Sequence, residues 1–118
     1  APPPAGHYSQ AMIHNDVVYV AGQLPITPEG KKLITASLAD QTMQVLQNLE
    51  AILKAAGSSP QHTLSVTIYI TDVANWGTVN EVYTRFFGDH KPARAIVPIK
   101  ELHYGLQIEV QAIAAVIG

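Results

Sequence analysis

The sequence contains no cysteine. This absence excludes disulfide bonds, thiolate catalysis and cysteine-ligated metal sites. It also agrees with a reducing compartment, and we expect a cytoplasmic protein. Long hydrophobic runs are missing as well, and none approaches the roughly 18 residues of a membrane-spanning helix. Residues 1–4, Ala-Pro-Pro-Pro, lack the charged and apolar regions of a signal peptide, so we expect no membrane partner.

Charged residues are scarce, at 14% of the chain, whereas 47% of its residues are hydrophobic. Such a composition is typical of a folded domain and not of a disordered chain. We expect a single domain over residues 1–118, with residues 1–6 poorly ordered. The 7 basic residues are scattered and the net charge is −2, which argues against nucleic acid as the main partner.

Several motifs of catalysis and metal binding are also missing. The sequence has no Gly-rich phosphate loop and no serine-nucleophile motif, and its five histidines lack a metal-ligand spacing such as His-x-x-x-His. We interpret the histidines as surface or packing residues, with the pair His103-Tyr104 as the candidate exception because it lies between two predicted strands. The sequence therefore predicts no metal site.

The periodicity of the apolar residues predicts six strands, one of them short, and two helices. Asn15-Asp16 has the chemistry of a hairpin turn, and Gly22 and Pro25 are expected to end the second strand. Ser37 and Asn75 are expected to cap the helices, which end near Gly57 and Gly88. The predicted strands span residues 10–15, 17–21, 32–34, 62–71, 93–99 and 106–116, and the helices follow the two capping residues.

This order predicts an α+β protein with a mixed sheet and two helices packed on one of its faces. Within residues 62–71 the alternation directs Leu64, Val66, Ile68 and Ile70 toward the core. Tyr69 then lies on the other face, which no helix covers. We expect that face to be covered in an oligomer.

Arg94 lies in an otherwise apolar predicted strand. It has two interpretations: an edge-strand charge that discourages aggregation, or a guanidinium that binds a carboxylate with two parallel hydrogen bonds. If residues 100–105 close a symmetrical hairpin, Arg94 and Glu109 become diagonal neighbours on one face. A purely structural ion pair is the alternative, and a bulge would change this register. Tyr8, taken alone, is typical of a packing residue with one wet end.

Six segments together carry a more specific signal, and they stand in one order along nearly the whole chain. They are GxYSQ (6–10), VYVAGQLP (18–25), QT with LxxILxxAG (41–57), NEVYxxFF (80–87), PAR (92–94) and IEVxAIA (108–114). In these segments the sequence resembles the RidA/YjgF family of reactive-imine deaminases.

The resemblance implies a chorismate-mutase-like α+β fold and a homotrimer with active sites in clefts between subunits. It implies hydrolysis of 2-imino or enamine acids to 2-oxo acids and ammonia without a cofactor, a role in metabolite damage control. Arg94 matches the family arginine that binds the substrate carboxylate, Glu109 the glutamate near the attacking water, and Tyr8 the N-terminal tyrosine. Main-chain groups near Ile96 are expected to hold the water, and Ala21 and His103 to line the substrate pocket.

Several positions depart from the family pattern. Ala21 and Ala95 stand where serine is common, and Ile96 where cysteine or threonine is common. His7 replaces the usual proline before Tyr8, and Leu-His-Tyr-Gly at residues 102–105 replaces Leu-Pro-x-Gly. These departures predict a subgroup with a different pocket lip.

Three other functions stay open. One is deamination of an enamine from aromatic-ring catabolism, with His103 or Lys100 binding a second carboxylate. Another is a non-enzymatic trimer that binds small carboxylates or has a regulatory role. The third is endoribonuclease activity or translation inhibition, which the net charge of −2 disfavours.

Overall fold

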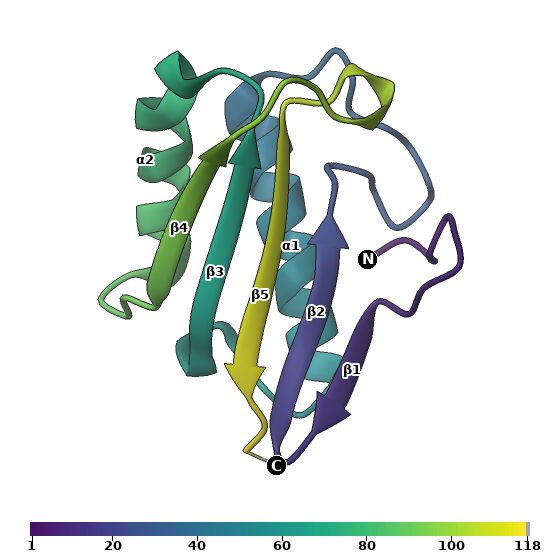
Figure 1. The fold of residues 1–118 in the computed structure, drawn as a ribbon, viewed down its shortest axis with the longest axis vertical. Helices are drawn as coiled ribbons and strands as arrows, with labels where there is room; N and C mark the ends of the chain where they lie inside the picture. The colour runs from purple at the N-terminus through teal and green to yellow at the C-terminus, as the bar shows by residue number, and fades with distance from the viewer. Residues whose placement is uncertain (118) are drawn as a thin grey trace.

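The computed structural model describes residues 1–117, and it confirms the predicted α+β architecture. A five-stranded sheet has the strand order β1-β2-β5-β3-β4, and two helices cover one of its faces, behind the sheet in Figure 1. β3 and β4 are parallel, and the other pairs are antiparallel. The elements are β1 (Ala11–His14), β2 (Val17–Gln23), α1 (Leu38–Ala55), β3 (Thr63–Ile70), α2 (Trp76–Phe87), β4 (Ala93–Pro98) and β5 (Ile108–Ala115). Short 3-10 turns lie at Pro60–His62, Val73–Asn75 and His103–Gly105.

The first hairpin forms as predicted. Asn15 and Asp16 both have positive φ angles, 51° and 61°, which the two central residues of a type I′ turn require. β2 extends two residues beyond the predicted range of 17–21, through a bulge to Gln23, and so ends between Gly22 and Pro25. The short strand predicted at residues 32–34 is absent. Only an isolated bridge joins Ile26 and Lys32 there, and the prolines of this loop have no N–H to extend a ladder.

The first predicted helix is confirmed at both ends. Ser37 Oγ accepts a hydrogen bond from Asp40 N, which satisfies one of the free amides of the first turn. Gly57, with φ 81°, ends α1 in a Schellman motif in which Ser58 N bonds the Leu53 carbonyl. The apolar stripe between these ends is buried against the sheet, as Leu46 and Leu49 show.

β3 deviates from the predicted alternation at its start. A bulge between Thr63 and Ser65 turns Thr63 inward and leaves Leu64 51% exposed. The prediction that Leu64 faces the core is therefore wrong, whereas Val66, Ile68 and Ile70 are buried as expected.

α2 begins after Asn75, but the Asn75 side chain makes no capping hydrogen bond. Asp72 performs that role one turn earlier, where its Oδ1 accepts from Ala74 N at the start of the preceding 3-10 turn. The buried residues of α2 are Val79, Val82, Tyr83 and Phe87, and Gly88, with φ 62°, ends the helix as predicted.

The predicted hairpin between the last two strands is wrong. β3 lies between β4 and β5 and pairs with both. The connection crosses over the end of β3: Ile99 N bonds the Ile70 carbonyl, and Thr71 N bonds the Gln107 carbonyl. Gln41 on α1 holds this crossing in place, because its Oε1 accepts from Gln107 N at 3.0 Å. The parallel β3-α2-β4 unit takes one side of β3, so β5 pairs on the other.

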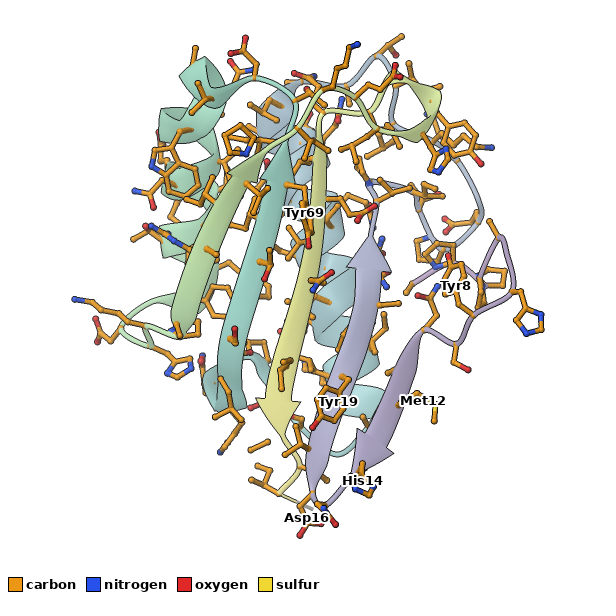
Figure 2. The ribbon with its side chains drawn as sticks, viewed as in Figure 1. Tyr8, Met12, His14, Asp16, Tyr19 and Tyr69 are labelled. Carbon is orange, nitrogen blue, oxygen red and sulfur yellow. The ribbon has the colours of Figure 1, made fainter. Side chains whose placement is uncertain are left out.

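The second face of the sheet carries no helix. Met12, Tyr19 and Tyr69 lie on this face, toward the viewer in Figure 2. Met12 and Tyr19 are 64% and 46% exposed. In residues 1–117 we find no helix that is long and apolar enough to cross a membrane.

Candidate active site

The predicted site residues fall into two groups within one chain. Arg94 on β4 pairs in register with Val66, whose side chain is buried beneath the helices. Glu109 on β5 pairs with Tyr69, which lies on the uncovered face. Since paired residues share a face, Arg94 and Glu109 lie on opposite faces of the sheet. The expectation that they are neighbours in one chain is therefore wrong, and the cause is the position of β3 between their strands.

Arg94 is held by three side chains of α2. Its Nη1 donates a hydrogen bond of 3.0 Å to Asn80 Oδ1. The guanidinium carbon lies 4.6 Å from the ring centroid of Trp76 and 4.9 Å from that of Tyr83. Residues 76, 80 and 83 follow the helical spacing and so share one face of α2. Each cation–π contact contributes about 0.5–1 kcal/mol at an exposed site and restricts the orientation of the guanidinium.

No carboxylate neutralises Arg94 within the described residues 1–117, where the ion pairs are Lys54 with Glu50 and Arg85 with Glu81. Arg94 is exposed, and its amide and aromatic partners carry no charge. The guanidinium therefore retains donors and a full positive charge for an external anion, and a carboxylate fits its planar fork. Ile96, two residues further along β4, lies on the same face and packs against the core.

Glu109 is half-buried, and this burial raises the pKa of its carboxyl group above the ordinary value of a glutamate. Positive charge on nearby His103 acts in the opposite direction on that pKa. Both side chains line a cavity of about 480 Å³, together with Glu101 and Leu102. A carboxyl group with a raised pKa in a cavity is suited to accept and return a proton.

Gly22 determines where the Glu109 side chain lies. A Cβ atom at Gly22 would stand 2.6 Å from Glu109 Oε2 and 2.9 Å from its Cδ, closer than real contacts allow. The absence of a side chain thus lets the carboxyl group lie against the β2 backbone. Gly22 belongs to the bulge between Val20 and Gln23, where β2 departs from regular pairing with β5.

Tyr8 lies on the N-terminal segment, at the opposite side of the sheet from β4 (Figures 1 and 2). It lines a second cavity, of about 550 Å³, together with Gly22 and His103. Two glutamines fasten this segment: Gln10 Nε2 donates to the Pro2 carbonyl at 2.6 Å, and the buried Gln23 donates to Gln10 Oε1 at 2.7 Å. The segment expected to be poorly ordered thus has a defined attachment.

The remaining predicted residues lie near this second group. Ala21 occupies the β2 bulge next to Gly22, and its backbone N donates to the Gln10 carbonyl at 2.8 Å. His103 lines both the Tyr8 cavity and the Glu109 cavity, so it lies where the two adjoin. The structure therefore brings Tyr8, Ala21, His103 and Glu109 to one region and leaves Arg94 and Ile96 on β4.

Residues that the sequence analysis missed support both groups. Asn80 and Trp76 hold Arg94, and Gly22 accommodates Glu109. Asn80 and Gly22 do stand inside the segments that resemble the family, but no property of the isolated sequence indicates what they contact. Lys32, which lines the Tyr8 cavity, lies in a loop that carries no motif. Within residues 1–117 no cluster of three or more histidine, aspartate or glutamate side chains could hold a metal ion.

Comparisons with known proteins agree with this description. A family model described as Endoribonuclease L-PSP matches residues 1–116. A RutC family protein of Pyrococcus horikoshii is 43% identical over 114 residues, covering 97% of this chain and 90% of the relative. A protein of Rattus norvegicus named 2-iminobutanoate/2-iminopropanoate deaminase is 39% identical, covering 97% of this chain and 83% of the relative.

A solved structure extends the similarity to three dimensions. Escherichia coli TdcF with bound serine is 35% identical and superposes with a TM-score of 0.92, covering 98% of this chain and 92% of that one.

The Gly22→Ala variant tests how Glu109 is positioned. We expect the new methyl group to displace the carboxyl group toward solvent, lower its pKa toward the ordinary value and cost about 1–2 kcal/mol of stability. Carboxyl NMR titration and thermal unfolding measure these effects. Gly77→Ala is the matched control, because its Cβ would meet nothing within 4 Å and alanine favours a helix. An unchanged Glu109 pKa in Gly22→Ala would contradict the assignment.

Proposed function

Since the chain belongs to the RidA/YjgF family, whose model carries the description Endoribonuclease L-PSP, we propose that it hydrolyses reactive 2-imino or enamine acids to 2-oxo acids and ammonia. The observation that carries this proposal is the state of Arg94. A guanidinium held by uncharged groups and paired with no carboxylate in residues 1–117 is suited to bind the carboxylate of a small acid. The name of the rat relative supports the choice of an imino acid.

The reaction requires no strong nucleophile from the protein, because a protonated imine is already electrophilic. Arg94 holds the carboxylate and so positions the adjacent C=N carbon. Glu109 takes a proton from water as the water oxygen bonds to that carbon and the C=N π electrons move to nitrogen. Protonated Glu109 then returns its proton to the amine nitrogen of this adduct, the C–N bond breaks to release ammonia, and the hydroxyl group gives its proton to Glu109 as the C=O bond forms. No cofactor is needed, and Tyr8 closes the pocket over the substrate.

This mechanism requires a second chain. Because Arg94 and Glu109 of one chain lie on opposite faces, we place the substrate between Arg94 of one subunit and Glu109 and Tyr8 of its neighbour. The uncovered face, with Met12 and Tyr19 exposed, is suited to such an interface. The proposed assembly is a homotrimer with three such clefts, and the proposed location is the cytoplasm.

Arg94→Ala and Arg94→Lys test the carboxylate site. We expect kcat/KM for 2-iminobutanoate to fall about 100-fold or more in both, because lysine keeps the charge but loses the two-point contact. Stability should fall by only about 1–2 kcal/mol, since Arg94 is exposed. Ammonia release from imines made in situ by an amino-acid oxidase measures activity, and thermal unfolding measures stability.

Arg85→Ala is the control for these variants, because Arg85 is an exposed arginine of α2, the helix that holds Arg94, and has its own glutamate partner. Near-normal hydrolysis by Arg94→Ala would refute the proposed role. If the wild-type protein released no ammonia but bound 2-oxobutanoate, the alternative of a carboxylate-binding trimer would replace the enzyme. Cleavage of RNA by the same preparation would favour the endoribonuclease alternative.

Mixed assemblies test whether the site is shared between chains. Arg94→Ala and Glu109→Gln subunits carry complementary defects, so we co-express them with two affinity tags and purify for both. Every mixed trimer then contains one junction that pairs an intact Arg94 with an intact Glu109, and about one third of wild-type activity returns. A site contained within one chain would give no recovery.

The raised pKa of Glu109 predicts that activity and folding stability depend on pH in opposite directions. As a base, Glu109 works deprotonated, so kcat/KM rises with pH through a midpoint above that of an ordinary glutamate. The folded protein holds this proton more tightly than the unfolded chain, so the stability that Glu109 contributes is present at low pH and lost as pH rises through the same range. Glu109→Gln should remove both dependences. A midpoint at or below the ordinary value would contradict the assignment.

A further inference from the structure

The cavity beside Tyr8 extends well beyond the residues that the proposed reaction uses. Its volume is about 550 Å³, and the N-terminal segment, the loop after β2 and the turn at His103–Gly105 enclose it. Leu24, Ile26 and the N-terminal prolines supply apolar walls, and Gly22 places one wall beside Glu109. A substrate whose reacting carbon lies near Glu109 therefore has space for a side chain in this direction.

Lys32 and Tyr104 both line this cavity. The Lys32 ammonium lies 4.7 Å from the centroid of the Tyr104 ring, within the range of a cation–π contact. Tyr104 has a φ of 64° and is followed by Gly105 at 72°, and this unusual backbone carries the ring to the cavity. The His103 ring lies 5.9 Å from the Tyr104 ring on the same turn.

Among residues 1–117, the cavity beside Tyr8 is lined by basic side chains and by no acidic ones. Lys32 is the permanent cation among the described residues that line it, and no aspartate or glutamate of residues 1–117 lines it. The ion pairs within those residues do not involve Lys32. An aromatic ring contacts one side of an ammonium and leaves N–H groups free, so Lys32 can bind a second anion here. Lys100, the lysine expected from the sequence, does not line this cavity.

We propose that this cavity binds an acidic side chain of the substrate, with Lys32 bound to its carboxylate and the intervening methylene groups against Tyr104. The preferred substrates are then 2-imino acids with two carboxylates, one on Arg94 and the other on Lys32. This inference rests on the proposed deaminase function and names the substrate class of that site. Lys32 acts on selectivity and not on the reacting atoms.

Lys32→Gln tests the proposal, with 2-iminoglutarate and 2-iminobutanoate as the two substrates, each made in situ by an amino-acid oxidase. We expect the ratio of kcat/KM for 2-iminoglutarate to that for 2-iminobutanoate to fall about tenfold, the effect of one charge-assisted hydrogen bond. Lys32→Arg should retain most of the ratio. Lys31→Gln is the matched control, because Lys31 is the exposed neighbour and does not line the cavity.

Binding of the stable products separates this inference from the proposed function. Calorimetric titration with 2-oxoglutarate should show about tenfold weaker binding to Lys32→Gln than to the wild-type protein. If Lys32 controls this binding but no imine is hydrolysed, the proposed function fails and the inference on the cavity stands. If imines are hydrolysed and Lys32→Gln leaves both the activity ratio and the 2-oxoglutarate affinity unchanged, the inference is overturned. A wild-type preference for imines of aromatic amino acids, retained in Lys32→Gln, would also overturn it.

Discussion

β3 hydrogen-bonds to β4 on one side and to β5 on the other, and the locations of the two candidate groups follow from this pairing. The parallel β3–β4 ladder directs Arg94 toward the helices, where α2 supplies an amide and two aromatic rings. The antiparallel β3–β5 ladder directs Glu109 to the uncovered face. One chain therefore holds two half-sites of the proposed active site, on opposite faces of the sheet. The proposed function thus makes assembly a requirement of the chemistry and not only of stability.

The two half-sites are built by different means. On the Arg94 side, regular secondary structure does the positioning, because one face of a helix repeats its contacts every turn. On the Glu109 side, irregular structure dominates: a bulge at Gly22, two glutamines that fasten the N-terminal segment, and a turn with positive φ angles at Tyr104 and Gly105. Under the proposed function, rigid elements bind the carboxylate common to all imino acids, whereas loops surround the part that differs between substrates.

The sequence predicted those features that local interactions determine. The Asn15-Asp16 turn, the Ser37 cap and the Gly57 end of α1 each depend on a few neighbouring residues. The order of the strands did not follow in the same way, because the position of β3 between β4 and β5 depends on contacts distant in the sequence. The bulge that exposes Leu64 has no local signal, since Leu64 continues the alternation of Val66, Ile68 and Ile70 in the sequence. The motifs identified Arg94 and Glu109 as candidate site residues, but only the pairing of the strands shows that they lie on opposite faces of the sheet.

The attachment of the N-terminal segment has a consequence for how such a protein diversifies. Hydrogen bonds through Gln10 and Gln23 hold this segment, and its prolines line the cavity while contributing little to the core. A change in the prolines, or in the loop that carries Lys32, alters the shape and charge of the pocket without creating a cavity beneath the helices. The buried amide of Gln23 is a fixed point of attachment, and the segment bound to it can change in sequence. New substrate preferences can therefore arise at small cost to folding stability, because the substitutions change residues that line the cavity and leave the core residues unchanged.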